Sequence, residues 1–316
     1  MATPISGNTP HAPILVTGAH RSGTTWVGKM LAAGGDLAYI SEPLNVFHRP
    51  GVMRAPVEHW YTYISTDNET DYLDALHETI ALRYHTWREI ASLRSPKDLL
   101  RMLRDAAAFA QGRLSHRRPL LKDPFAIFSA PWFASRLNCR VVTVVRHPAA
   151  FVSSLKRFDW SFDFQHLLSQ PLLMRDWLDP FRAQMKAADN NPSDQINRAS
   201  LLWSLIYHVV SQYSQSQPEF TILRHEDLSL NPLTSFEELY KNFDLPFNPR
   251  ARRRIMRATS SRNPSEISAR SKYSVNLDSR VNIKNWQTRL TQDEITRIRE
   301  LTQTISTRFY TDQDWE

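Results

Sequence analysis

The strongest constraint on the fold is a short apolar run that ends at a glycine and leads into sequence with helical spacing. Residues 13–18 read PILVTG, and residues 24–35 read TTWVGKMLAAGG, with a Gly-Gly stop at the end. This pattern predicts a strand, a loop and a helix. Similar units follow at residues 139–158 and 219–243. Continuous apolar strands that alternate with helices predict an α/β fold, with a parallel sheet covered by helices on both faces.

Two long stretches with mostly helical spacing separate these units, at about residues 43–118 and 158–217. Within the second, residues 199–213 place apolar side chains on one face, which predicts a helix turned toward the core. The chain has no internal repeat, and its eight glycines are too few for a flexible linker. We therefore expect a single domain over residues 1–316, with these two stretches as helical insertions.

Composition narrows the functional class. A formal net charge of +7 suits an anionic ligand, although a solvated basic surface explains it equally well. The densest basic run, residues 251–257, lacks an accompanying zinc or RNA-binding signature, so we expect a surface helix and no nucleic-acid partner.

The cysteine content bears on the compartment. The single cysteine, Cys139, rules out an intrachain disulfide and favours a reducing compartment. Because no leader pattern opens the sequence and no long apolar run follows, we expect a cytoplasmic protein without membrane contact.

The loop TGAHRSGTTW, residues 17–26, is close to a phosphate-binding P-loop. Gly18 and Gly23 have the required spacing and Thr25 stands in the hydroxyl position, but Thr24 replaces the lysine that reaches the β- and γ-phosphates. A loop at the carboxyl end of a parallel strand presents backbone N–H groups and a helix N-terminus to an anion. The missing lysine therefore indicates a ligand without a γ-phosphate, and Arg21 supplies a positive charge elsewhere in the loop.

This loop resembles the 5′-phosphosulfate loop of sulfotransferases that use 3′-phosphoadenosine 5′-phosphosulfate (PAPS). It is similar to the arginine form found in bacterial, carbohydrate and protein-tyrosine enzymes. The resemblance implies a P-loop-type fold, with the helical insertions on the acceptor side, and release of adenosine 3′,5′-bisphosphate (PAP). It also implies donor contacts from the whole segment His20, Arg21, Ser22, Gly23, Thr24, Thr25 and Trp26.

A second segment, VVTVVRHPAAFVSSLKR, resembles the part of the family that binds the 3′-phosphate. Arg146 ends the apolar run and Ser154 follows eight residues later, which is the family's spacing. An arginine fork and a serine hydroxyl suit the oxygens of a phosphate. Taken alone, Arg146 could equally pair with a surface carboxylate.

Two further matches suggest catalytic residues. LLKDPFAIF resembles the segment whose lysine lies near the transferring group, which implies that role for Lys122, while Asp123 either orients Lys122 or caps the turn at Pro124. Glu42 lies where arginine-type members place their catalytic glutamate, and a carboxylate can take the proton of an acceptor hydroxyl. His48 is the alternative base, and Glu42 could instead be a cap or an ion-pair partner.

The segment SRVNIKNWQTRL faintly resembles the family's late loop. It implies contacts to the 3′-phosphate from Arg280 and Lys284, with Trp286 as a packing residue. Trp26 could stack on adenine or belong to the core. His20 and His147 flank the two arginines, but no metal-ligand spacing accompanies them, so we expect no metal.

The sequence is thus interpreted as a sulfotransferase that moves a sulfuryl group to an acceptor hydroxyl by in-line displacement. The resemblance favours a carbohydrate or small natural product as the acceptor. A P-loop kinase of a nucleoside or adenylylsulfate is the alternative, and a binding protein with a vestigial loop is a third reading. The kinase would need a lysine at Thr24 and a magnesium ligand.

Overall fold

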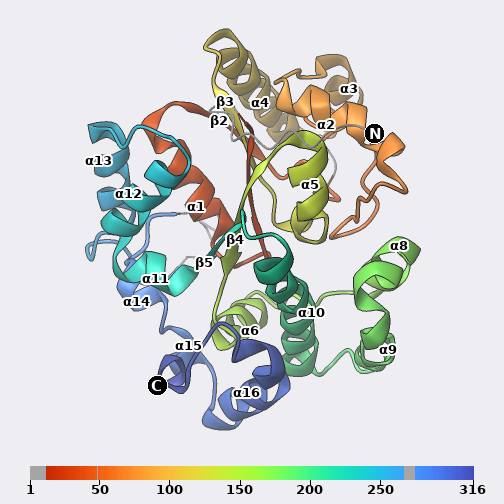
Figure 1. The fold of residues 1–316 in the computed structure, drawn as a ribbon, viewed down its shortest axis with the longest axis vertical. Coiled ribbons are helices and arrows are strands. Elements are labelled where there is room, and N and C mark those ends of the chain that lie inside the picture. Colours follow the sequence, from red (N-terminus) through yellow and green to blue (C-terminus); the bar gives the residue numbers. More distant parts are fainter. Residues whose placement is uncertain (1–11, 48, 267–274) are drawn as a thin grey trace.

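A computed structural model describes residues 12–47, 49–266 and 275–316, and its centre is a five-stranded sheet (Figure 1). The strands lie in the order β2-β3-β1-β4-β5, and all neighbouring pairs are parallel. This arrangement confirms the predicted α/β fold with a parallel sheet. The strands are β1 (Ile14–Gly18), β2 (Leu37–Ser41), β3 (Arg118–Lys122), β4 (Arg140–Val145) and β5 (Thr221–Arg224).

Three strands correspond to the predicted units, and two were not predicted. β5 is shorter than the apolar run at 219–228, because from His225 onward the chain forms helix α11. β2 lies at the sheet edge and is only partly buried, and β3 begins with Arg118 and Pro119. An arginine and a proline at the start of a strand weaken the apolar signal on which strand prediction depends.

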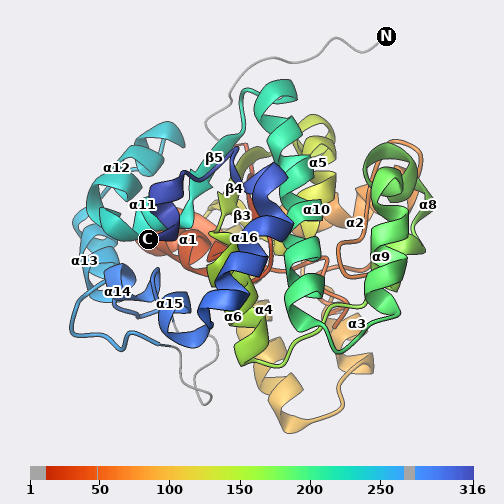
Figure 2. The same cartoon turned by 90° about the horizontal axis from the view of Figure 1, so that it is seen from below.

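Helices cover both faces of the sheet (Figures 1 and 2). Helices α1, α12 and α13 pack on one another, and α6, α10 and α16 form a second group. In chain order the helices are α1 (Thr24–Leu31), α2 (Leu73–Ile80), α3 (Thr86–Ala91), α4 (Pro96–Leu114), α5 (Ala130–Leu137), α6 (Pro148–Arg157), α7 (Gln165–Leu168), α8 (Pro171–Leu173), α9 (Arg182–Asp189), α10 (Gln195–Ser216), α11 (His225–Leu230), α12 (Pro232–Asn242), α13 (Pro249–Ala258), α14 (Ser279–Asn282), α15 (Trp286–Arg289) and α16 (Gln292–Ser306).

The sheet separates two hydrophobic clusters. Along β1, Ile14 and Val16 belong to the cluster shared with α1, α12 and α13, whereas Leu15 belongs to the larger cluster with α6 and α10. This alternation follows from the two-residue period of a strand. Because all strands are parallel, the carboxyl ends of β1, β4 and β5 meet at one edge, where a ligand site is expected in such a sheet.

Two helix predictions are confirmed. α10 buries the predicted apolar face, including Leu202, Leu205 and Ile206, and α13 buries only Ala251, Ile255 and Ala258 while its arginines face outward. None of the helices in the described ranges is long and apolar enough to cross a bilayer.

Candidate active site

The loop between β1 and α1 requires both of its glycines. Gly18 has a φ of +145° and Gly23 a φ of +97°, which side chains other than glycine rarely adopt. A Cβ atom on Gly18 would lie 2.4 Å from the backbone oxygen of Val144, and one on Gly23 would lie 2.5 Å from Nδ1 of His225. The loop is therefore packed closely against β4 and α11.

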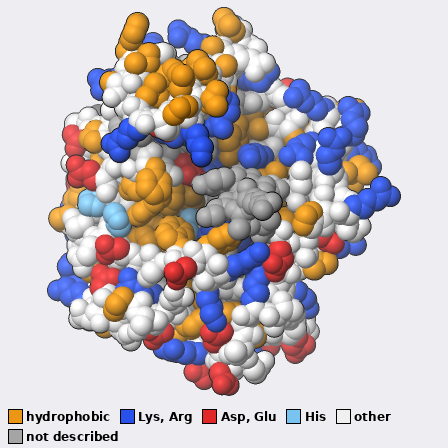
Figure 3. All heavy atoms as spheres, turned by 180° about the vertical axis from the view of Figure 1, so that it is seen from behind, with side chains coloured by type: hydrophobic (Ala, Val, Ile, Leu, Met, Phe, Trp, Pro, Cys, Tyr) orange, Lys and Arg blue, Asp and Glu red, His pale blue; other side chains and the backbone are white. Residues whose placement is uncertain are grey.

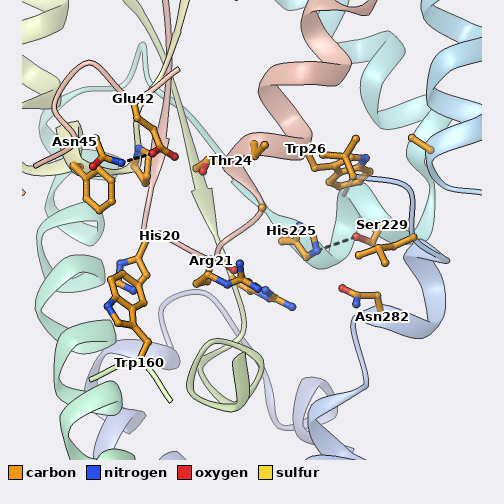
Figure 4. Close-up of a pocket in the computed structure, with 18 of the residues that line it drawn as sticks. His20, Arg21, Thr24, Trp26, Glu42, Asn45, Trp160, His225, Ser229 and Asn282 are labelled. Carbon is orange, nitrogen blue, oxygen red and sulfur yellow. Dashed lines mark hydrogen bonds between the residues drawn. The ribbon is translucent and has the colours of Figure 1, made fainter. Parts of the chain in front are cut away.

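The start of α1 is suited to an anion. Gly23 is the N-cap and has no side chain to accept from the first N–H groups, and Thr24, Thr25 and Trp26 bring no carboxylate into the first turn. These N–H groups have no partner within the helix and carry the positive end of its dipole. Gly23, Thr24 and Thr25 also line the main cavity, as Figure 4 shows for Thr24. The loop can thus hold a phosphate or sulfate group.

The two predicted arginines meet beside this loop. Arg146 follows β4, and its Nη1 donates to the backbone oxygen of Arg21 at 2.6 Å. Arg21 Nε donates to Ser154 Oγ on α6 at 3.1 Å, and its guanidinium lies 4.5 Å from the ring centroid of Phe158. The structure therefore brings Arg21, Arg146 and Ser154 together, and both arginines line the cavity.

The guanidinium group of Arg146 is largely buried. Burial lowers the pKa of its guanidinium, with Glu226 acting in the opposite direction. An arginine nonetheless stays protonated in a protein. Its buried Nε has no hydrogen-bond partner among the described residues. A buried donor in this position is readily explained by a ligand acceptor.

Glu42 comes directly after β2 and is held by its neighbours. Its φ is +51°, and its backbone N–H donates to the oxygen of Lys122 at 2.8 Å. Lys122 Nζ forms an ion pair with Oε1, and Asn45 Nδ2 donates to Oε2 at 2.6 Å. Lys122 is only 2% exposed and lies beneath Glu42, whereas Glu42 and Asn45 line the cavity. Both carboxylate oxygens are thus oriented by hydrogen bonds before any acceptor arrives.

Asp123 caps the turn at Pro124, which was one of its two predicted roles. Its Oδ1 accepts from the Phe125 N–H at 2.9 Å, and Oδ2 accepts from the Leu44 N–H at 2.6 Å. It therefore joins the turn after β3 to the loop that carries Glu42. Burial raises the pKa of the Asp123 carboxyl to about 7, although its two backbone hydrogen bonds act in the opposite direction.

The raised pKa of Asp123 predicts a pH-dependent stability. The unfolded carboxyl releases its proton near pH 4, whereas the folded one holds it to about pH 7. In this interval the folded chain binds more protons, so the free energy of unfolding falls as pH rises, by at most about 1.4 kcal/mol per pH unit. In the Asp123→Asn variant, the free energy of unfolding measured with urea should not show this decrease with pH. Parallel pH profiles for variant and wild type would contradict the assignment.

A cavity of about 320 Å³ connects these groups. Figure 4 shows Arg21 near its middle, Glu42, Asn45 and Trp160 toward one end, and Trp26 and His225 toward the other. The side chains that line the Glu42 end are mostly aromatic and come from distant segments: Phe47, Trp60, Phe125 and Trp160. The other end, called the polar end here, carries His225, Ser229, Ser279 and Asn282 together with the apolar Trp26, Ala258 and Leu277.

His20, a predicted donor contact, lies at the aromatic end of the cavity (Figure 4). Its Nδ1 is 2.5 Å from Oη of Tyr61, and that hydroxyl also accepts from the His20 backbone N–H at 3.2 Å. Its ring makes an edge contact with Trp160, with a centroid distance of 3.8 Å. Burial, together with the neighbouring Arg21, lowers the pKa of His20 well below its usual value. His20 is therefore a neutral side chain that lines the cavity.

His147 faces a different cluster. Its ring stacks on Trp286 with centroids 5.0 Å apart, and its backbone N–H donates to Glu226 at 3.0 Å. Trp286 is 3% exposed and has the predicted packing role. Within the described ranges, no three His, Cys, Asp or Glu side chains converge as the ligands of a metal ion would.

The predicted contacts near the carboxyl terminus are placed differently from the expectation. Arg280 is exposed and its Nε donates to a backbone carbonyl of α11 at 3.2 Å, while Lys284 Nζ donates to the last residue of the chain at 2.9 Å. Neither side chain lines the cavity, but their neighbours Ser279 and Asn282 do. The segment of the faint motif thus borders the cavity, and the role of Arg280 and Lys284 stays a prediction. His48, the alternative base, lies outside the described residues.

Trp26 and His225 form the wall of the polar end. Trp26 is 8% exposed and makes edge contacts with Phe236 at 5.2 Å and His225 at 5.3 Å, so it both lines the cavity and belongs to a core cluster. Burial lowers the pKa of His225 to about 3. His225 was not among the predicted site residues. The strand before it was predicted, and the rule that ligands bind at the carboxyl ends of parallel strands would have indicated it.

Comparison with known proteins gives the family. The family model of the sulfotransferase domain matches residues 11–309. A sulfotransferase domain from the curacin biosynthetic pathway is 15% identical, with 92% of this chain and 96% of that chain covered and a TM-score of 0.47. Mouse sulfotransferase SULT7A1, complexed with PAP, is 12% identical over 96% and 87% of the two chains, with a TM-score of 0.43. Sulfotransferase STF9 from Mycobacterium avium is 14% identical over 96% and 78%, with a TM-score of 0.44.

No curated protein matches the chain in sequence. The assignment therefore depends on the domain match, which spans nearly the whole chain, because the three structural likenesses are too remote to carry it. Members of the matched family take the sulfuryl group from PAPS. The chain belongs to the sulfotransferase domain family and is a PAPS-dependent sulfotransferase.

Proposed function

We propose that this enzyme transfers the sulfuryl group of PAPS to a hydroxyl of a small acceptor with an apolar body, with Glu42 as the general base. The observation that carries the proposal is the order of groups along the cavity. A base-bearing aromatic end, a central arginine at a helix N-terminus, and a polar end follow one another (Figure 4). This order matches a donor and an acceptor that meet at Arg21.

The residues at the Arg21 and Trp26 parts of the cavity suit PAPS, the sulfuryl donor. The N-terminus of α1 and Arg21 would hold the 5′-phosphosulfate, and Arg146 with Ser154 would hold the 3′-phosphate. Trp26 and His225 offer flat walls for the adenine. Two buried donors or acceptors in this region, Arg146 Nε and His225 Nδ1, have no partner among the described residues, which supports a polar ligand there.

The chemistry needs one proton transfer and stabilisation of one leaving group. As the acceptor oxygen forms its bond to sulfur, its proton passes to the Glu42 carboxylate, and the bond from sulfur to the 5′-phosphate oxygen breaks. Arg21 and the α1 N–H groups stabilise the charge on the departing phosphate. Lys122 orients the Glu42 carboxylate, since its Nζ is buried against Oε1.

The lining of the acceptor end supports an apolar substrate. Phe47, Trp60, Phe125 and Trp160 contribute ring surfaces, and Trp60 lies 4.4 Å from Phe125 by ring centroids. Flat apolar walls with a few polar groups favour a phenol or another hydroxyl on a hydrophobic skeleton. A free sugar would leave most of its hydroxyls without partners at these rings. A small natural product therefore suits the cavity better than a glycan.

The donor site can be tested without knowing the acceptor. We expect PAP to raise the melting temperature, because a ligand at about 100 times its Kd stabilises the folded state by roughly 2.7 kcal/mol. AMP, which lacks the 3′-phosphate, should shift it less. A shift with ATP and Mg²⁺ but not with PAP would instead favour the kinase alternative.

The acceptor class needs a separate assay. Transfer from PAPS to a panel of phenols, aliphatic alcohols and monosaccharides can be followed by mass spectrometry of the sulfated product. We expect phenols to react best and monosaccharides least. The reverse order would refute the proposed acceptor while leaving the donor site intact.

A further inference from the structure

Helices α3 and α4 carry most of the large apolar side chains that are exposed within the described part of the chain. On α3, Trp87 is 84% exposed, and on α4, Leu100 and Leu114 are 68% and 81% exposed. Figure 2 shows this pair of helices projecting from the molecule, and in Figure 3 hydrophobic side chains gather over them at the top of the view. An apolar patch of this kind on a protein surface marks an interaction site.

The exposed apolar residues of α4 form a regular stripe. Leu99, Leu103, Ala107, Ala110 and Leu114 follow one another at intervals of three and four residues, and all are exposed. Residues at these intervals share one face of a helix. The residues that α4 buries, Met102, Phe109 and Gly112, lie on a different face. α4 thus has a second apolar face that nothing in the described chain covers.

Basic side chains border this stripe. Lys97, Arg101 and Arg104 run beside it on α4, again at intervals of four and three residues. Figure 3 shows Lys and Arg side chains directly below the hydrophobic group. Within the described ranges, Lys97 and two further cations, Arg88 and Arg113, make no ion pair.

The acidic side chains of the two helices are already occupied inside the protein. Glu89 is buried and accepts from the backbone N–H of Gly51 at 2.8 Å. Asp98 pairs with Arg101 at 2.9 Å, and Asp105 pairs with Arg49 at 2.7 Å and with Arg104 at 3.0 Å. The surface that α3 and α4 offer is therefore apolar, and its net positive charge comes from Lys97, Arg88 and Arg113.

Helix α4 is attached to the loop at the acceptor end of the cavity. Arg49, whose Nη1 pairs with Asp105 of α4, also donates to the backbone oxygen of Ser41, the residue before Glu42. Phe47 lies on the same loop, is 79% exposed and lines the cavity. The loop that carries Phe47 thus holds α4 through Asp105, which lies on the face of the helix opposite the exposed stripe.

We propose that α3 and α4 form a docking face for a membrane surface that contains anionic phospholipids. A helix with an exposed apolar stripe, basic flanks and a tryptophan nearby has the character of one that lies in the bilayer interface. This surface is less suited to pairing with a second copy of the chain, because a two-fold contact would bring the basic side chains of the two copies together. The expectation of no membrane contact depended on the lack of a long apolar run, which tests for a span and not for an interfacial helix.

The test is sedimentation of the full chain with vesicles. Vesicles that contain phosphatidylserine should bind the protein, vesicles of phosphatidylcholine alone should bind it much less, and added salt should weaken binding. The double variant Leu100→Glu/Leu103→Glu should bind at least about tenfold more weakly, because the loss of one buried leucine alone exceeds this factor. Neither substitution touches the cavity, so the affinity for PAP should be unchanged.

The control is Leu301→Glu, which places one of the two added charges on an exposed leucine of α16, at the opposite end of the molecule in Figure 1. It should bind vesicles like the wild type. Absence of wild-type binding to anionic vesicles at low salt would overturn the proposal, as would binding that survives the double variant. Self-association of the wild type that the double variant abolishes, without vesicle binding, would show a contact between copies instead. None of these outcomes depends on the acceptor or on the identity of the base.

Discussion

Replacing Glu42 by glutamine is expected to lower turnover by about 100-fold or more, while the affinity for PAP stays unchanged. Glutamine keeps the shape of the side chain and can still contact Asn45 and Lys122, but it cannot take a proton from the acceptor. The residue lies at the aromatic end of the cavity, away from Trp26 and His225 at the polar end (Figure 4). A loss confined to turnover would therefore identify a group that acts on the acceptor.

The choice of acceptor makes this experiment specific for proton transfer. para-Nitrophenol is largely ionised in mildly alkaline buffer and needs no base, whereas an alkylphenol of similar size is protonated and does. We expect the Glu42→Gln variant to lose most of its activity toward the alkylphenol and far less toward para-nitrophenol. An equal loss with both would mean that Glu42 positions the acceptor and does not deprotonate it.

The buried Lys122 requires a further control. In Glu42→Gln its ammonium group, 2% exposed, loses the carboxylate partner, and an unpaired buried charge is destabilising. The double variant Glu42→Gln/Lys122→Met removes both charges and should recover stability without recovering activity toward the alkylphenol. Recovery of activity in the double variant would show that the single variant failed through misfolding of the loop.

The parts of the site that the sequence predicts are those encoded by local chemistry. The loop of residues 17–26 follows from glycine spacing, since Gly18 and Gly23 have backbone angles and close contacts that other residues do not allow. Arg146 and Ser154 lie on one strand-loop-helix unit, so their spacing in sequence determines their proximity in space. Their assignment to the 3′-phosphate stays a prediction.

The parts that the sequence does not reveal depend on long-range packing. The acceptor end is assembled from Phe47, Trp60, Phe125 and Trp160, and aromatic residues in sequence are more often core than cavity wall. Lys122 was expected near the transferring group, but a motif cannot show that its side chain is buried beneath Glu42. Strands β2 and β3 were missed because their apolar pattern is weak, although β3 carries that lysine.

Replacing Arg146 by alanine is expected to abolish the preference for PAP over AMP. Loss of one partner from a desolvated charged contact usually costs about 2 to 4 kcal/mol, so PAP affinity should fall by at least about 30-fold. AMP has no 3′-phosphate and should bind the variant almost as it binds the wild type. Calorimetry with both ligands measures this, and unchanged PAP affinity would remove Arg146 from the 3′-phosphate site.

Arg146 also donates to the backbone oxygen of Arg21, so Arg146→Ala could disturb the loop as well as remove a phosphate contact. Measuring both PAP and AMP distinguishes these two effects. If the variant only loosened the loop, the affinities for PAP and AMP would fall together, since both place a phosphate at α1. Arg140→Ala is the matched control: Arg140 begins β4, at the end opposite Arg146, and pairs with Asp244 at 2.6 Å. Its loss should leave both affinities unchanged. Arg146→Lys, which keeps the charge but not the fork, should retain only part of the preference for PAP.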